Sequence, residues 1–212
     1  MCKILLTGVL LLSFSFIASA QFNKGDMLLG GQLSYNSTKN DYIPSLNANN
    51  GNFTVSIGRA VKDNAVFGIT LSYSPGSQKN NDPNNFYDNT FNGYSAGIFY
   101  RLYKPLGKEF YFFGEGGANY IGSTSASKNM SGVKISSGTS NAGSIYIMPG
   151  IAYRISKKFF LEVNIPNRFS VTYLNEKTTS SGISSTTDSF GASASLTSNA
   201  LSNIGIGFRL VL

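Results

Sequence analysis

Apolar and small polar residues alternate along most of this chain, which is the pattern of β-strands with two different faces. In the clearest run, Phe67, Ile69, Leu71 and Tyr73 alternate with glycine, threonine and serine. No segment has a convincing helical periodicity, so we expect an all-β fold. The pattern predicts eight strands, which lie near 27–35, 53–57, 67–73, 94–102, 110–120, 144–155, 159–165 and 203–212.

The predicted connections alternate between short and long. Three are short, near 61–65, 104–108 and 156–158, and the other four are rich in Asn, Ser, Thr and Gly, which favour turns. This alternation places every long connection at one end of the sheet and both termini at the other. It predicts an eight-stranded antiparallel up-and-down transmembrane β-barrel with short periplasmic turns and long extracellular loops. The long loops are expected at about 37–51, 74–92, 123–142 and 174–200.

The residues of the polar rows favour a membrane barrel over a soluble sheet. A soluble sheet turns its polar face to water and usually carries many Lys and Glu there, whereas these rows are mostly Gly, Ser, Thr and Asn. Small residues fit the interior of an eight-stranded barrel, which side chains just fill. Closure also pairs backbone amides that lipid cannot satisfy. A soluble sandwich or a lipocalin-like periplasmic barrel is the alternative.

Aromatic residues near the strand ends predict two interface girdles. Four of them border the long loops, at Tyr35, Phe53, Tyr73 and Tyr94. Six more border the short turns, at Phe67, Tyr103, Phe110, Tyr153, Phe159 and Phe208.

The composition fits one folded domain without histidine chemistry. The 212 residues include 16 Phe and 12 Tyr but no Trp or His, and the formal net charge is +7. With 42% hydrophobic and only 13% charged residues, the chain is not expected to be disordered. The absence of His removes most hydrolase and metal-site chemistry, because His is the usual near-neutral base and the commonest metal ligand.

Residues 1–20 are predicted to be a cleaved secretory signal peptide. Lys3 supplies the positive start, residues 4–17 form an apolar run, and Ala18-Ser19-Ala20 is a cleavage site. The mature barrel domain would then be 21–212, beginning at Gln21. An uncleaved N-terminal membrane helix is the alternative, although the run is short for a span. Cys2 precedes the apolar run, which argues against a lipid-anchored cysteine.

Several stretches resemble the outer membrane protein beta-barrel family of Gram-negative envelopes. They are 112–117 (FFGEGG), 148–155 (MPGIAYRI), 160–163 (FLEV) and the closing 204–208 (IGIGF). The chain is similar over 21–212 to the small eight-stranded barrels like outer membrane protein X and the barrel domain of outer membrane protein A. The Asn-rich loops and the Pro-Gly-x-x-Tyr strand look like versions from Bacteroidetes-type bacteria. The resemblance implies insertion by the barrel-assembly machinery, although this chain ends in Leu212 rather than in the aromatic residue common in the family.

Alternation predicts that five charged side chains point into the barrel from the fourth to the eighth strand. Because an unpaired buried charge is very costly, charges of both signs in a narrow lumen should pair. We expect a structural ion-pair network that fills the barrel and fixes the strand register. A narrow polar conduit or gate is the functional alternative. The five residues are Arg101, Glu115, Arg154, Glu162 and Arg209.

The sequence offers little for catalysis or metal binding. Glu115 and Glu162 could form an acid–base pair in principle, but no substrate-pocket signal accompanies them. Four side chains of the second long loop carry oxygen ligands that suit calcium, namely Asp82, Asn84, Asn85 and Asp88. Their spacing matches no calcium-binding loop, so a solvated turn is the favoured interpretation. We expect no enzyme activity, no cofactor and no metal site.

The expected partners are outer-membrane lipids rather than nucleic acid. Five lysines at the short turns suit the anionic phospholipid headgroups of the inner leaflet, namely Lys62, Lys104, Lys108, Lys157 and Lys158. Nucleic-acid binding would need a basic patch with interleaved aromatics outside the membrane. We expect a monomeric, non-enzymatic outer-membrane barrel with an envelope-structural or surface-interaction role. A small porin or channel for ions or hydrophobic solutes is the alternative, and a periplasmic ligand-binding barrel is a third hypothesis.

Overall fold

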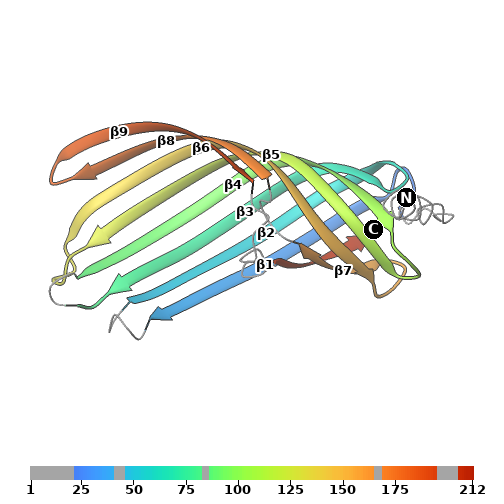
Figure 1. Cartoon of the computed structure of the whole chain (residues 1–212), viewed down its shortest axis with the longest axis horizontal. Helices are drawn as coiled ribbons and strands as arrows, with labels where there is room; N and C mark the ends of the chain where they lie inside the picture. Colours follow the sequence, from blue (N-terminus) through green and yellow to red (C-terminus); the bar gives the residue numbers. More distant parts are fainter. Residues whose placement is uncertain (1–21, 41–45, 83–85, 165–168, 195–204) are drawn as a thin grey trace, which may run out of the picture.

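The computed structural model describes residues 22–40, 46–82, 86–164, 169–194 and 205–212. The predicted signal peptide, residues 1–20, lies outside these ranges. The described ranges contain no helix that is long and apolar enough to cross a membrane. They form β1 (Met27–Asn40), β2 (Leu46–Lys62), β3 (Ala65–Asn80), β4 (Tyr87–Pro105), β5 (Phe110–Lys128), β6 (Lys134–Arg154), β7 (Phe159–Asn164), β8 (Phe169–Ser180), β9 (Ile183–Ala194) and β10 (Gly205–Val211) (Figure 1).

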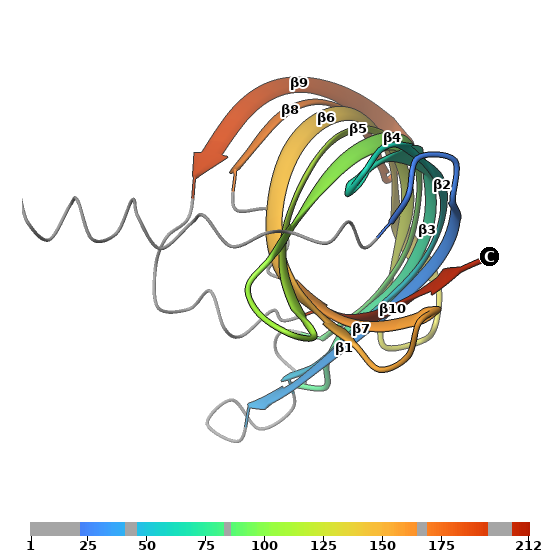
Figure 2. The ribbon, with the colours of Figure 1, turned by 90° about the vertical axis from the view of Figure 1, so that its right-hand side faces the viewer.

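Antiparallel pairing closes the sheet into a ring of eight strands. The order is β5-β4-β3-β2-β1-β10-β7-β6, and β5 also pairs with β6, which completes the circle (Figure 2). The ring confirms the predicted eight-stranded up-and-down barrel. β6 pairs with β7 through 150–154 and with β8 through 136–147, so β8 continues the wall above β7. β9 returns along β8 as a hairpin.

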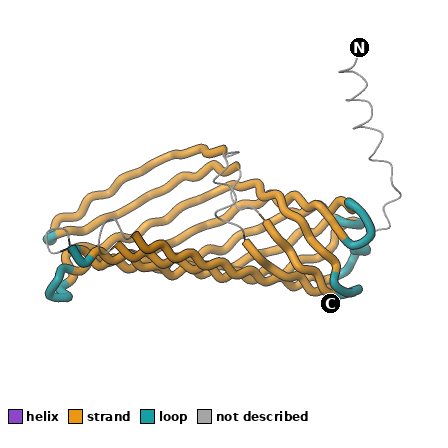
Figure 3. Tube along the Cα trace, turned by 60° about the horizontal axis from the view of Figure 1, so that its bottom comes forward, coloured by secondary structure: helices purple, strands orange, loops and turns teal. Residues whose placement is uncertain are grey.

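The expectation of four long loops is wrong, because most of those residues extend the strands. Strands fill most of the length of the molecule, and the described turns lie at its two ends (Figure 3). Small polar side chains on neighbouring strands bond to each other, as Ser37 Oγ does to Asn49 Oδ1 at 2.8 Å and Ser123 Oγ to Ser140 Oγ at 2.7 Å. The β8–β9 hairpin needs only Ser181 and Gly182 at its tip, with φ of 49° and 81°. Both values suit the two-residue turn that matches strand twist.

The apolar rows face outward, as the alternation predicts. On β3, Phe67, Ile69, Leu71 and Tyr73 are 47–59% exposed, whereas Gly68 and Thr70 between them are buried. The same alternation continues around the ring. The outward apolar row of β6 runs from Ile145 to Tyr153, a length that suits a tilted strand crossing a bilayer core.

The interior differs from the expected lining of small polar residues. Near the short turns it holds an aromatic cluster, here called the aromatic floor, which consists of Phe22, Phe99, Tyr103, Tyr111, Phe113, Tyr146 and Phe160. Tyr103 is therefore not a girdle residue, because it lies inside with only 6% exposure. Inner glycines make room for the rings. A Cβ at Gly68 would lie 2.7 Å from Cε1 of Phe99, and one at Gly150 would meet the ring of Phe113.

The segment that precedes β1 closes the end of the barrel. The ring of Phe22 is fully buried, with its centroid 4.7 Å from that of Tyr103 and 5.1 Å from that of Phe160. Asn64, in the β2–β3 turn, donates its backbone N–H to the carbonyl oxygen of Phe22 at 3.0 Å. Gly25 donates to the carbonyl oxygen of Ala60 at 2.8 Å. Backbone hydrogen bonds and the packing of Phe22 in the aromatic floor thus hold the segment at the short-turn end.

Candidate functional site

Four buried charged residues meet inside the barrel directly above the aromatic floor. Arg101 comes from β4, Glu115 from β5, Glu162 from β7 and Arg209 from β10. Each occupies an inward position of its strand and is between 3% and 6% exposed. Arg101 and Glu115 are direct cross-strand partners, so the register itself brings these two together.

The four side chains form one chain of alternating charge, here called the lumen network. Arg101 contacts Oε2 of Glu115 through Nη2 and Oε2 of Glu162 through Nη1, both at 2.6 Å. Arg209 donates from Nε to Oε1 of Glu162 at 3.0 Å and from Nη2 to Oε2 at 3.3 Å. Two positive and two negative charges balance each other. Because a buried ion without a partner costs several kcal/mol, this balance is what makes the burial tolerable.

Two tyrosines that the sequence analysis missed complete the hydrogen bonding of the carboxylates. Tyr103 donates its hydroxyl to Oε1 of Glu162, and Tyr146 donates to Oε1 of Glu115, each at 2.8 Å. The guanidinium of Arg101 also lies 4.2 Å from the ring centroid of Phe113. Strict alternation along the strands could have identified both tyrosines as inward-facing. It places Tyr103 on the same face as Arg101, and it places Tyr146 on the face opposite to the outward Ile145 and Ile147.

Arg154 does not belong to the lumen network, contrary to the expectation. It is the last residue of β6, and its Nε contacts Oε2 of Glu109 in the β4–β5 turn at 2.6 Å. The two side chains are 32% and 41% exposed. The hydrogen bond from Arg154 lowers the pKa of the Glu109 carboxyl below its usual value. At the strand end the nearest acid is in the adjacent turn, so Arg154 forms an exposed pair there.

A small cavity of about 40 Å³ borders the lumen network, and Phe99 of the aromatic floor is among the residues that line it. One water molecule needs roughly 10–15 Å³ of cavity volume, so the cavity holds a few waters at most. Besides the network it is lined by polar groups that include Gln32, Thr54, Ser56 and Thr70. The lumen next to the charges is therefore lined by both polar groups and an aromatic ring.

No arrangement for catalysis or metal binding emerges in the described residues. Glu115 and Glu162 both bind Arg101, and no group of three or more His, Cys, Asp or Glu that could hold a metal ion occurs there. Of the calcium candidates, Asn84 and Asn85 lie outside the described residues. Asp82 donates its backbone N–H to Oδ1 of Asn80 at 2.9 Å, and Asp88 lies on β4 between Lys79 and Lys128.

Comparison with known protein families gives a match that covers most of the chain. The family description "Outer membrane protein beta-barrel domain" matches residues 6–197. Similar solved structures include Neisserial surface protein A (13% identity, 88% of this chain and 96% of that chain, TM-score 0.40). A major outer membrane protein from Thermus thermophilus is also similar (8% identity, 89% of this chain and 99% of that chain, TM-score 0.48). So is Ail, the attachment invasion locus protein of Yersinia pestis (12% identity, 88% of this chain and 99% of that chain, TM-score 0.37). No curated protein sequence matches the chain.

Proposed function

The chain belongs to the outer membrane protein beta-barrel family, and from this we propose that it is a non-enzymatic integral outer-membrane protein with a closed lumen. Its role would be to stabilise the envelope or to present its long polar hairpins for surface contact. The observation that supports a closed lumen is the lumen network stacked on the aromatic floor. Passage through the barrel would have to separate the buried charges and displace the rings beneath them.

The energetic argument for closure rests on Glu162, which binds both arginines. Breaking a buried ion pair by removing one partner costs about 3–5 kcal/mol, because the other charge is left uncompensated. An opening that separates Glu162 from Arg101 and Arg209 faces a cost of this kind unless water replaces the contacts. The closed barrel is therefore the resting state in this proposal.

A small channel is the second candidate, and the polar cavity beside the lumen network favours it. The side of the lumen beyond the aromatic floor already offers hydroxyl and amide groups, such as Thr54 and Gln32. A rearrangement of the network and of Phe22 would then join this side to the short-turn end.

Planar-bilayer recording of the purified protein separates the two functions. The proposal predicts no stepwise conductance for the wild-type protein. Stepwise currents that change in E115Q and E162Q but not in R154Q would establish the channel instead, because Arg154 lies outside the lumen network. The R154Q variant is thus the matched control for a charge change elsewhere in the barrel.

The proposal includes export through a signal peptide that is cleaved between Ala20 and Gln21. Phe22 would then be the second residue of the mature chain, and its packing in the aromatic floor places that end of the chain at the short turns. We expect the intact mass of protein purified from outer membranes to match residues 21–212. A mass that retains residues 1–20 would contradict cleavage.

Insertion by the barrel-assembly machinery as a monomer is also part of the proposal. Outer-membrane fractionation and gel electrophoresis of unboiled and boiled samples test it. We expect the protein in the membrane fraction as one folded band that shifts on heating, since a closed small barrel resists detergent. Recovery in the soluble periplasm would contradict the membrane assignment.

A further inference from the structure

The short-turn end of the barrel carries an excess of exposed positive charge, here called the basic collar. Its members lie at the ends of β2 and β4, in the β4–β5 and β6–β7 turns, and in the segment before β1. All of them are exposed. The basic collar consists of Lys24, Arg59, Lys62, Lys104, Lys108, Lys157 and Lys158.

The acidic residues at this end are too few to balance the basic collar. Asp26 accepts a hydrogen bond from the backbone N–H of Asn23 at 2.8 Å, and Asp63 accepts one from that of Lys24 at 3.1 Å, so both keep their negative charge. Glu109 pairs with Arg154, which is outside the basic collar. The seven cations of the collar therefore outnumber the two remaining carboxylates.

The opposite end of the barrel has no such excess among the described residues. Five lysines there are accompanied by four acids, so the charges nearly cancel. The lysines are Lys39, Lys79, Lys128, Lys134 and Lys177, and the acids are Asp82, Asp88, Glu176 and Asp188. The positive charge of the described barrel is thus concentrated at one end.

Two members of the basic collar sit on the outer wall directly beside outward aromatic rings. Arg59 follows Ile57 in the outward row of β2, and its cross-strand partners are Met27 and Phe67. Lys104 follows Leu102 in the outward row of β4 and is the partner of Phe112. These cations face sideways from the barrel at the lower edge of the apolar rows.

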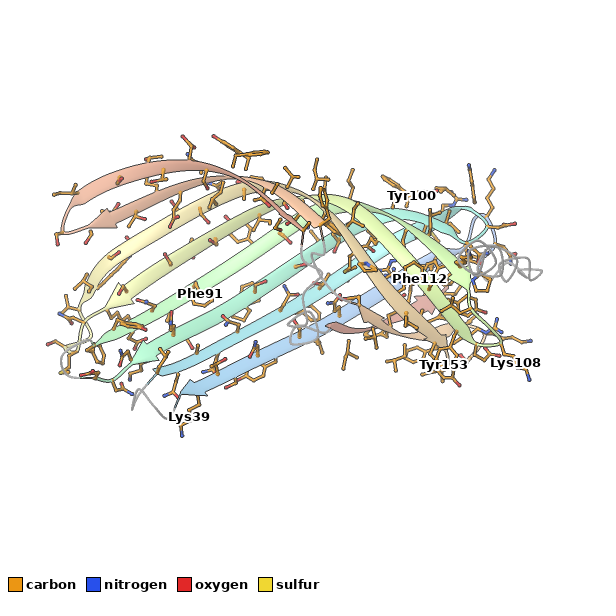
Figure 4. All side chains as sticks on the ribbon, viewed as in Figure 1. Lys39, Phe91, Tyr100, Lys108, Phe112 and Tyr153 are labelled. Carbon is orange, nitrogen blue, oxygen red and sulfur yellow. The ribbon has the colours of Figure 1, made fainter. Side chains whose placement is uncertain are left out.

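The turn residues extend the same charge beyond the aromatic rings. Figure 4 shows Lys108 at the end of the barrel that also carries Phe112 and Tyr153, whereas Lys39 lies at the far end. The rings of Phe110 and Tyr153 pack at a centroid distance of 4.8 Å. Cations next to an outward aromatic belt are placed at the depth where lipid phosphates lie.

We propose that the basic collar binds the phosphate groups of anionic glycerophospholipids in the periplasmic leaflet. The inference rests on the proposed function, because the short turns must face the periplasm. Lipid fits better than an anionic glycan below the membrane, because Arg59 and Lys104 point sideways at the edge of the apolar surface. Each Lys or Arg near an anionic surface adds to the attraction, which acts over about one Debye length.

The test compares two variants that lose the same number of lysines from opposite ends. The collar variant carries K104Q, K108Q, K157Q and K158Q, and the distal variant carries K39Q, K79Q, K128Q and K134Q. Each full-length protein is reconstituted into vesicles of phosphatidylcholine with a minority of phosphatidylglycerol. Mild extraction and native mass spectrometry then give the ratio of the two lipids that remain bound.

We expect wild type and the distal variant to retain phosphatidylglycerol preferentially, and the collar variant to lose this preference by about tenfold or more. Equal preference in the collar and distal variants would overturn the proposal. A collar variant that keeps its lipid preference but no longer sediments with purified peptidoglycan would overturn it in favour of a glycan partner. Vesicle flotation checks insertion separately, since a wild-type protein that fails to float contradicts the barrel proposal itself.

Discussion

Glu162 is the residue on which most of the lumen network depends. Its two carboxylate oxygens accept hydrogen bonds from Arg101, Arg209 and Tyr103, and its exposure is 3%. No other carboxylate in the described barrel contacts two arginines. Through Arg209 it links β7 to the neighbouring β10, and through Arg101 it links β7 to β4, which is not a neighbour of β7 in the ring.

Replacing Glu162 by Gln should destabilise the barrel strongly. The change keeps the shape of the side chain but leaves Arg209 without its ion-pair partner, and an uncompensated buried charge costs about 3–5 kcal/mol. We expect a loss of about 3 kcal/mol in the free energy of unfolding, measured by reversible urea unfolding in lipid vesicles.

The exposed pair of Arg154 and Glu109 provides the control. Solvent-exposed ion pairs contribute little because water screens them, so E109Q should leave the unfolding curve almost unchanged. Equal losses in E162Q and E109Q would contradict the central place of the buried carboxylate.

Gly68 shows why the inner rows are rich in glycine. A Cβ at this position would lie 2.7 Å from the ring of Phe99 and closer still to the carbonyl oxygen of Ile57. Gly68→Ala should therefore cost about 1–3 kcal/mol through overpacking. Gly114→Ala is the matched control, because a Cβ there has no heavy atom within 4 Å. The same unfolding experiment checks both, and a stable G68A protein would show that the floor is loosely packed.

For single residues, the sequence predicts whether a side chain points into the barrel better than it predicts which residue that side chain pairs with. Alternation gives the inward position of Arg101, Glu115, Glu162 and Arg209 because strand periodicity fixes the face. It could not show that Arg154 is too near the strand end to reach the others. That depends on how strands are staggered around the ring, which no local pattern contains.

Among the elements, the extended hairpins are the main departure from the sequence-based expectation. Serine, threonine and asparagine favour turns when each residue is judged alone. On paired strands the same side chains satisfy one another, as Thr179 Oγ1 and Ser184 Oγ do at 2.8 Å. The polar content indicates where the strands leave the membrane, and the pairing across strands decides where they end.

The segment before β1 is an element that alternation could not have identified, since it belongs to no strand. Phe22→Ala should destabilise the barrel by about 3 kcal/mol, because removal of a fully buried ring leaves a cavity against Tyr103 and Phe160. Thermal unfolding monitored by the mobility of unboiled samples measures the effect. Leu106→Ala is the control, since Leu106 is 56% exposed in a turn at the same end.

Equal unfolding midpoints for F22A and L106A would contradict the view that this segment closes the floor. A large shift for F22A alone would support it. Because Phe22 also contacts Tyr103, which donates to Glu162 of the lumen network, the packing of the segment and the order of the charges are expected to be linked.

At the scale of the whole molecule, the barrel divides its side chains between two environments, the outer surface and the lumen. Outside the aromatic floor, large apolar side chains face away from the barrel, and charged side chains that face inward are paired. The sequence was sufficient to predict the eight strands of the ring, their antiparallel order and the outward rows, because all three depend on period-two alternation and connection length. The aromatic floor was not predicted, since the rings need inner glycines from neighbouring strands to fit.

The most direct test of this division is a cysteine scan of residues 67 and 69–73 on β3 in lipid vesicles. The only cysteine of the chain, Cys2, precedes the proposed cleavage site, so single introduced cysteines can carry a spin label without interference. We predict that labels at 67, 69, 71 and 73 are accessible to a lipid-soluble relaxation agent, and that labels at 70 and 72 are not. Protection of the odd positions from lipid, with the even positions exposed or with no alternation, would contradict a barrel whose apolar rows face the membrane.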